Sequence, residues 1–143
     1  MSLFHLSSRL PMPQRIALIT LVVADYDEAI RFYTEKLGFT LVEDTPLSAE
    51  KRWVRVAPPG TSGAELLLAR AATPTQQAAI GNQTGGRVAL FLYTDDLARD
   101  HARLLAQGVR IVRPPVVEPY GRVLVFADLY GNLWDLLESA QSV

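Results

Sequence analysis

The sequence predicts an α+β fold in which two βαβββ modules form an open, curled, eight-stranded sheet that resembles a barrel, with helices outside. The order strand, helix, glycine, strand occurs twice, about 70 residues apart. The first copy opens with the apolar run 16–23 and the second with the run 88–93. A duplicated unit that cannot bury its own sheet face must pack against its twin or a second chain. We therefore predict one duplicated domain over residues 15–138.

The first module is predicted to span residues 15–70. The near-continuous apolar run 16–23 indicates a buried strand. Asp25, with Glu28 three residues later, is typical of a helix start, and Gly38 is typical of a helix end. Three more strands are expected at 39–43, 52–57 and 64–69, with a loop at 44–50 able to close over a site.

A connector is predicted over residues 71–86, with a short helical turn at 76–80. The second module, residues 87–138, repeats the order of the first. It is expected to hold a helix at 96–106 and strands at 88–93, 109–113, 122–127 and 132–138. Its last hairpin turns at 128–132, where Gly131 or Asn132 can supply a positive φ. Residues 1–14 are predicted to be an N-terminal arm.

The charge and the amino-acid composition exclude several classes of function. The net charge is −1 and the pI is about 6.1, so no basic field is available for nucleic acid or an anionic membrane. The chain has no cysteine, which excludes disulfides, thiolate metal sites and a cysteine nucleophile. We find no membrane-spanning run and no signal peptide, and therefore expect a cytoplasmic protein whose partner is a small molecule or another protein.

Two segments carry a family resemblance. Residues 23–39 contain Phe-Tyr-x-x-x-Leu-Gly-Phe, and residues 126–132 read Phe-Ala-Asp-Leu-Tyr-Gly-Asn. With the paired βαβββ order, they resemble the vicinal oxygen chelate superfamily, which includes glyoxalases, extradiol dioxygenases, fosfomycin-modifying enzymes and bleomycin-resistance proteins. The resemblance spans residues 15–138 and is more specific for fold than for function.

Catalytic members of that superfamily hold a divalent metal on the inner sheet faces, through His or Glu side chains from both modules. The resemblance places the four ligand positions at Leu18, Glu65, Ala89 and Asp135. Leu18 and Ala89 cannot bind a metal, and the only two histidines, His5 and His101, fall in the arm and in a predicted helix. We expect no resident cofactor, and a weakly held divalent ion such as Mg²⁺ or Mn²⁺ on the two carboxylates stays open.

Glu65 and Asp135 are the candidate catalytic residues. If both face a cleft, burial and mutual repulsion raise one pKa and leave a base or an acid–base couple. Arg87, two residues before Ala89, is expected on the same strand face, where it would form a structural ion pair with the carboxylates instead. A register shift of one residue would turn Asp135 outward.

Aromatic and cationic side chains are the remaining candidates for substrate binding. Trp53 and Arg55 share one face of their strand while Arg52 and Val54 share the other, so only one pair can line the cleft. The other predicted substrate-binding residues, beside Leu18 and Ala89, are Arg87, Phe91, Tyr93 and Arg122, with Tyr120 and Trp134 as further aromatic candidates. Core packing is the alternative for each aromatic and a solvated edge charge for each arginine.

Three functions remain from the sequence. One is a metal-free module that binds an apolar or aromatic small molecule between the modules, as bleomycin-resistance proteins do. The second is a divergent lyase, isomerase or dioxygenase that uses Glu65 and Asp135, with a weakly held metal or none. The third is an interaction domain whose cleft its own side chains fill. A homodimer is expected because open sheet edges need covering.

Overall fold

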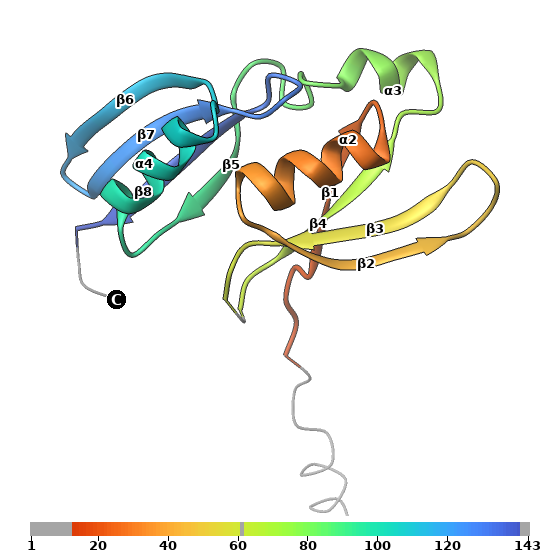
Figure 1. Ribbon diagram of the computed structural model, residues 1–143, viewed down its shortest axis with the longest axis horizontal. Helices are drawn as coiled ribbons and strands as arrows, with labels where there is room; N and C mark the ends of the chain where they lie inside the picture. The colour runs from red at the N-terminus through yellow and green to blue at the C-terminus, as the bar shows by residue number, and fades with distance from the viewer. Residues whose placement is uncertain (1–12, 61, 141–143) are drawn as a thin grey trace, which may run out of the picture.

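Two four-stranded sheets build the protein (Figure 1). The computed structural model describes residues 13–60 and 62–140. The first sheet has the order β1-β4-β3-β2 and the second β5-β8-β7-β6. In each, the first strand pairs in parallel with the last and the other pairs are antiparallel. Neither sheet closes into a barrel. The predicted α+β class with two modules is confirmed.

The strand bounds follow the duplication. The first sheet contains β1 (Leu18–Val23), β2 (Thr40–Pro46), β3 (Arg52–Ala57) and β4 (Glu65–Arg70). The second contains β5 (Val88–Tyr93), β6 (Ile111–Glu118), β7 (Gly121–Ala127) and β8 (Leu133–Ser139). The helical segments are α2 (Tyr26–Arg31), η1 (Phe32–Lys36), α3 (Pro74–Ala79) and α4 (Leu97–Ala106).

The first helix begins where the sequence predicts. The Asp25 side chain accepts a hydrogen bond from the Glu28 backbone N–H at 2.8 Å, which satisfies one of the free donors of α2. The single predicted helix changes at Phe32 into the π-helical turn η1. This helical segment is followed, after its C-cap Leu37, by Gly38, whose φ of +75° is readily available only to glycine.

Two strands end three or more residues beyond the prediction, whereas the other strand bounds differ by at most two residues. β2 continues to Pro46, so the first part of the predicted loop 44–50 is strand and the turn is confined to 47–51. β6 continues to Glu118, beyond the predicted end at Arg113. Pro114 and Pro115 fit because β6 is an edge strand whose register shifts between Arg113 and Val116, so the missing N–H groups break no regular ladder.

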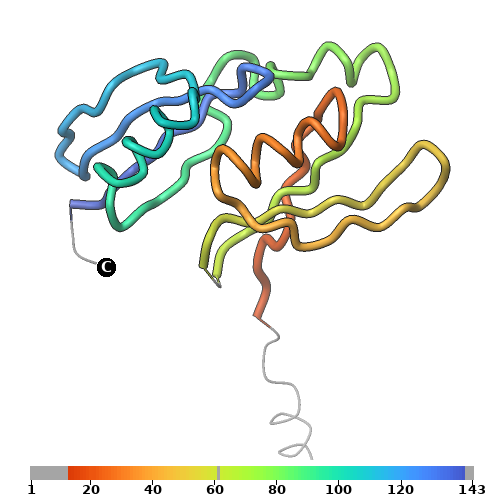
Figure 2. The backbone as a smooth tube through the Cα atoms, viewed as in Figure 1, coloured from red at the N-terminus to blue at the C-terminus, as the bar shows by residue number. Residues whose placement is uncertain are grey.

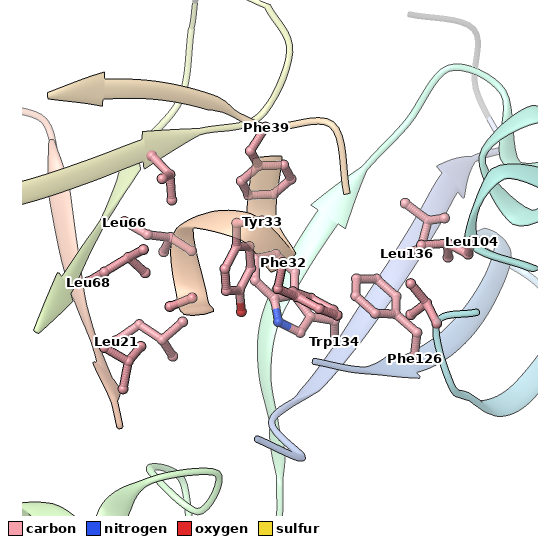
Figure 3. Packing of buried hydrophobic residues seen from close by; sticks show 14 of the residues in the cluster. Leu21, Phe32, Tyr33, Phe39, Leu66, Leu68, Leu104, Phe126, Trp134 and Leu136 are labelled. Carbon is pink, nitrogen blue, oxygen red and sulfur yellow. The ribbon is translucent and has the colours of Figure 1, made fainter. Parts of the chain in front are cut away.

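One hydrophobic core joins the two modules. The rings of Tyr33, Phe39 and Trp134 contact one another, and Trp134 stacks on Phe126 with 5.6 Å between the ring centroids (Figure 3). The Tyr33 hydroxyl donates a 2.6 Å hydrogen bond to the buried Asp128 carboxylate at the β7–β8 turn. A helix of the first module is thus fastened to the second sheet.

The connector between the modules runs along one end of the molecule and carries α3 (Figure 2). Residues 1–12 of the predicted N-terminal arm lie outside the described residues. Within the part of the chain that the structure describes, every helix is too short or too polar to cross a bilayer.

Candidate functional site

The first sheet has one covered face and one open face. Helix α2 packs on the face that carries Leu21, Val54 and Leu66. Because side chains alternate along a strand, the opposite face, which we call the open face, carries Leu18, Trp53, Arg55 and Glu65. Of the two pairs that the sequence left open, Trp53 with Arg55 is therefore the one on the open face, while Val54 is buried in the core.

An ionic cluster lies on the open face. Arg55 Nε donates to Glu43 Oε1 at 2.9 Å, and Arg55 Nη1 donates to Glu65 Oε1. The Thr45 hydroxyl and the Arg55 guanidinium lower the pKa of Glu43. Leu18 is the register partner of Glu65 across the parallel β1–β4 pair. An apolar side chain and an arginine therefore lie beside Glu65, the carboxylate at the ligand position that the resemblance gives in the first module.

A groove extends from this cluster along the open face. Its larger part has a volume of about 820 Å³ and is lined by β1, β3, β4 and α3, among them Thr20, Trp53, Leu67 and Gln76. At its far end it reaches the edge of the sheet, where Tyr26 of α2 and the turn residues Ser48, Glu50 and Lys51 also line it. A shallower part of about 260 Å³ lies over Leu18, Trp53 and the Arg55 cluster. Trp53 belongs to both parts, so its indole lies between them. The volume falls in the range of small-molecule sites.

Asp135 lies on the other sheet, away from Glu65. It is the register partner of Phe91 on β5 and of Val125 on β7. Burial raises the pKa of its carboxyl, an effect that Arg113 partly offsets. Among the described residues the Asp135 carboxylate has no hydrogen bond or ion pair. The two predicted catalytic carboxylates are thus placed by different sheets, and Glu65 alone lies on the groove.

Two predicted site residues, both arginines, lie elsewhere. Arg87 is exposed in the bend before β5 and does not pair with Glu65; Arg55 takes that role. Arg87 precedes β5, so the regular strand alternation does not extend to it, and its predicted ion pair with the carboxylates is not formed among the described residues. Arg122 is in register with Glu138, so alternation puts it on the face opposite to Asp135. The three arginines Arg55, Arg87 and Arg122 therefore do not converge on one anion.

Phe91 and Tyr93 are exposed, at 63% and 70%. They do not line the groove with Trp53. Both line a cavity between the modules, on the side of Phe39 and Pro59. The single cleft predicted between the modules is therefore replaced by a groove on the first sheet and a separate cavity between the modules.

Sequence reasoning missed Glu43, Gln76 and Arg113. Glu43 opposes Arg55 only because the β2–β3 register shifts between Leu41 and Glu43, and no sequence signal marks that shift. Gln76 belongs to the connector, whose short helix was expected but whose place beside the first sheet was not. Arg113 is in register with Val125, which is in register with Asp135, and only the pairing of β6 with β7 places it there.

The donor set does not match a divalent metal of the kind used by the catalytic members. Leu18 and Ala89 carry no donor atom, Glu65 is engaged by a guanidinium, and Asp135 stands on the other sheet. Among residues 13–60 and 62–140, no three His, Cys, Asp or Glu side chains gather to form a metal site. Arginine competes with a cation for carboxylate oxygens.

Fold and groove together define a small two-module protein with a ligand-sized hollow on one sheet face. The chain belongs to the glyoxalase/bleomycin resistance protein/dioxygenase superfamily, whose family model matches residues 15–136. The resemblance drawn from residues 23–39 and 126–132 is thereby confirmed.

One relative in sequence and two solved structures are each at least 31% identical to this chain. A protein of Shewanella frigidimarina (strain NCIMB 400) is 59% identical over 128 residues, covering 89% of this chain and 95% of the relative. The crystal structure of UcmS2 has a TM-score of 0.77 and 31% identity, covering 88% of this chain and 98% of its own. The structure of TnmS3, an antibiotic binding protein from Streptomyces sp. CB03234, has a TM-score of 0.73 and 32% identity, covering 92% and 100%.

Proposed function

We propose that the protein binds an aromatic small molecule in the groove of the open face, without a resident metal. The observation that carries the proposal is a groove of about 820 Å³ walled by the Trp53 indole, at whose shallow end Arg55 already engages Glu65. An indole offers a flat apolar surface for stacking. Because Glu65 is already paired with Arg55, it is a poor metal ligand.

The comparison with TnmS3 supports this proposal. That protein is described as an antibiotic binding protein, and this chain matches all of its length at 32% identity. Likeness of fold alone does not transfer a ligand, so Trp53 and the groove carry the argument.

We also propose a homodimer. The edge strands β1, β2, β5 and β6 of the two sheets leave unpaired backbone groups among the described residues. Several large apolar side chains on or beside them are exposed: Ile16, Ile19, Leu41, Val42, Val112, Val116 and Val117. Exposed apolar surface of this kind is typical of an interface. A second copy would cover it, and light scattering coupled to size exclusion measures the mass. The cytoplasmic location stays a prediction.

Ligand binding is tested by native mass spectrometry of freshly purified protein, followed by calorimetric titration with a panel of planar aromatic compounds. We expect saturable binding that quenches Trp53 and weakens about tenfold in Trp53→Ala, since a stacked aromatic contributes about 1.4 kcal/mol. Tyr120→Ala is the matched control because Tyr120 is exposed and lines neither part of the groove. Equal binding in both variants would contradict the proposal.

Metal binding is tested on the same protein with Mn²⁺, Zn²⁺, Ni²⁺ and Fe²⁺. We expect no stoichiometric binding tighter than about 10 µM, or roughly 7 kcal/mol. Binding above that strength that disappears in Glu65→Ala or Asp135→Ala would support the alternative, a divergent lyase, isomerase or dioxygenase. The observation on its side is Asp135, a carboxyl without a hydrogen bond among the described residues, whose pKa burial raises.

A further inference from the structure

A second hollow separates the two modules on the side of the helices. One cavity of about 580 Å³ and one of about 450 Å³ share Phe39, Pro58, Pro59, Leu92 and Tyr93 as lining residues. We call this continuous hollow the helix-side trough. It is bounded by the β3–β4 turn of the first module and by β5 and α4 of the second (Figure 1). No residue that lines it lines the groove on the open face.

The body of the trough is apolar. Leu104, Phe126 and Leu136 belong to the buried core and present their remaining surface to it, and Phe39 closes it from the first module. Figure 3 shows Leu136 next to Leu104 of α4, with the Phe126 ring below them in the view. Such a lining favours an apolar ligand body.

The rim of the trough carries one cation without a partner. Its charged residues are Asp95, Arg99, Asp100 and Arg103. Arg99 forms ion pairs with Asp95 at 2.8 Å and with Asp100 at 3.0 Å. The Arg103 guanidinium has no hydrogen bond or ion pair among the residues that the structure describes, although the Arg103 backbone carbonyl accepts from the Gln107 N–H. The rim therefore leaves one guanidinium free to bind an anion.

The fold places the Arg103 guanidinium against the backbone of Gly38. Its atoms lie so close to Gly38 that a Cβ placed there would come within 2.6 Å of Arg103 Nη2. Lys36 Nζ donates a 2.8 Å hydrogen bond to the Gln107 carbonyl, which fastens the end of η1 to the end of α4. Arg103 is thus folded across the end of the first module, at the trough, although it remains exposed to solvent.

From the apolar lining and the free guanidinium we infer that the helix-side trough binds an amphipathic organic monoanion, with its apolar body against Phe39 and Leu104 and its anionic group on Arg103. A guanidinium binds a carboxylate through two parallel N–H···O bonds. Charge complementarity favours this occupant over a neutral one.

The two tryptophans allow the trough to be studied alone. The chain contains only Trp53 and Trp134. Trp53 lines the groove of the open face, whereas Trp134 lines the trough and stacks on Phe126. In Trp53→Phe, the remaining emission comes from Trp134 and reports on the trough. A failure of the proposed function, which concerns Trp53, therefore leaves this test intact.

The probes are decanoate, decanol and decylamine, which share an alkyl chain and differ in charge. In Trp53→Phe we expect decanoate to change the Trp134 emission saturably and to bind about tenfold more tightly than decanol, with decylamine weakest. Adding Arg103→Met should bring decanoate to the level of decanol. Arg110→Met is the control, since Arg110 is also exposed but does not line the trough.

Three results would overturn the inference: no saturable emission change with decanoate, equal affinity for decanoate and decanol, or unchanged decanoate affinity in Arg103→Met. A dimer that hides the trough would give the first result. Arg103→Met should melt at the temperature of the parent, because the side chain makes no hydrogen bond among the described residues, so a loss of binding is not a loss of folding.

Discussion

Replacement of Tyr33 by Phe should destabilise the protein by breaking the bond between its modules. The Tyr33 side chain is fully buried, and its hydroxyl donates to Asp128 Oδ2 at 2.6 Å. Asp128 keeps three further donors after the change, namely the backbone N–H groups of Tyr130 and Asn132 and the Asn132 side chain. The Asp128 carboxylate therefore loses the hydrogen bond from Tyr33 and keeps the other three.

A buried hydrogen bond to a charged group contributes about 2 kcal/mol. With a urea m-value of about 1.5 kcal/mol per molar, the midpoint of unfolding should fall by about 1.3 M. Tyr120→Phe removes an exposed hydroxyl and should leave the midpoint unchanged. A double-mutant cycle with Asp128→Asn should return a coupling of about 1 kcal/mol or more. A Tyr33→Phe protein within about 0.5 kcal/mol of the parent would refute this account.

The pH dependence tests the same bond. Burial, followed by the Asp128 charge, raises the pKa of Tyr33 well above its usual 10.0. The native state therefore keeps a proton that the unfolded chain releases above about pH 10, so this stabilisation is complete below that pH and is lost as the pH rises. Urea titrations between pH 8 and 11, values chosen to bracket about 10, should show a steeper fall in unfolding free energy for the parent than for Tyr33→Phe. Parallel curves would show that Tyr33 does not titrate with unfolding.

Three shorter predictions concern local features. Asp25→Ala should lower the unfolding free energy by about 1 kcal/mol, because it removes the hydrogen bond to the Glu28 N–H, and urea denaturation measures it. Gly38→Ala and Gly108→Ala should each destabilise by about 1.5 kcal/mol in the same assay, since φ is +75° at one and +72° at the other; a near-zero change at either would contradict the backbone argument. Asp135→Asn should stabilise the protein at neutral pH and not at pH 3. Because the pKa of Asp135 is raised in the native state, the unfolding free energy of the parent falls as the pH rises above the usual 3.8 of an Asp carboxyl. Melting curves over pH 3–8, a range of about five units, show whether the parent loses stability relative to Asp135→Asn.

The sequence predicted those parts of the fold that local chemistry determines. Asp25 and Gly38 mark the ends of a helical segment because capping and positive φ depend on the residue itself. The β5 bounds 88–93 match because that run is apolar and lies between turn residues. Gly131, with φ of +94°, supplies the predicted turn conformation.

The predictions that the structure does not bear out concern contacts with residues distant in the chain. Alternation was extended to Arg87, but β5 begins only at Val88, and the irregularity between Val88 and Leu90 is visible only in the pairing with β8. Arg55 was predicted at the site, whereas its ion pair with Glu43 requires a register shift in β2. The helix-side trough is formed by two modules meeting, which no single segment encodes.

The two proposed sites lie on opposite faces of one sheet. Thr20 and Leu67 line the groove, while their chain neighbours Ile19 and Leu66 line the trough. Binding at one site changes affinity at the other only if it favours a different arrangement of what lies between them. What lies between is a core of fully buried side chains, Leu21, Val54 and Leu68, with little freedom to rearrange. Saturating the trough with its ligand should therefore change the affinity of the groove for its own ligand by less than about twofold. A larger change would mean that the first sheet moves relative to the second when a ligand binds.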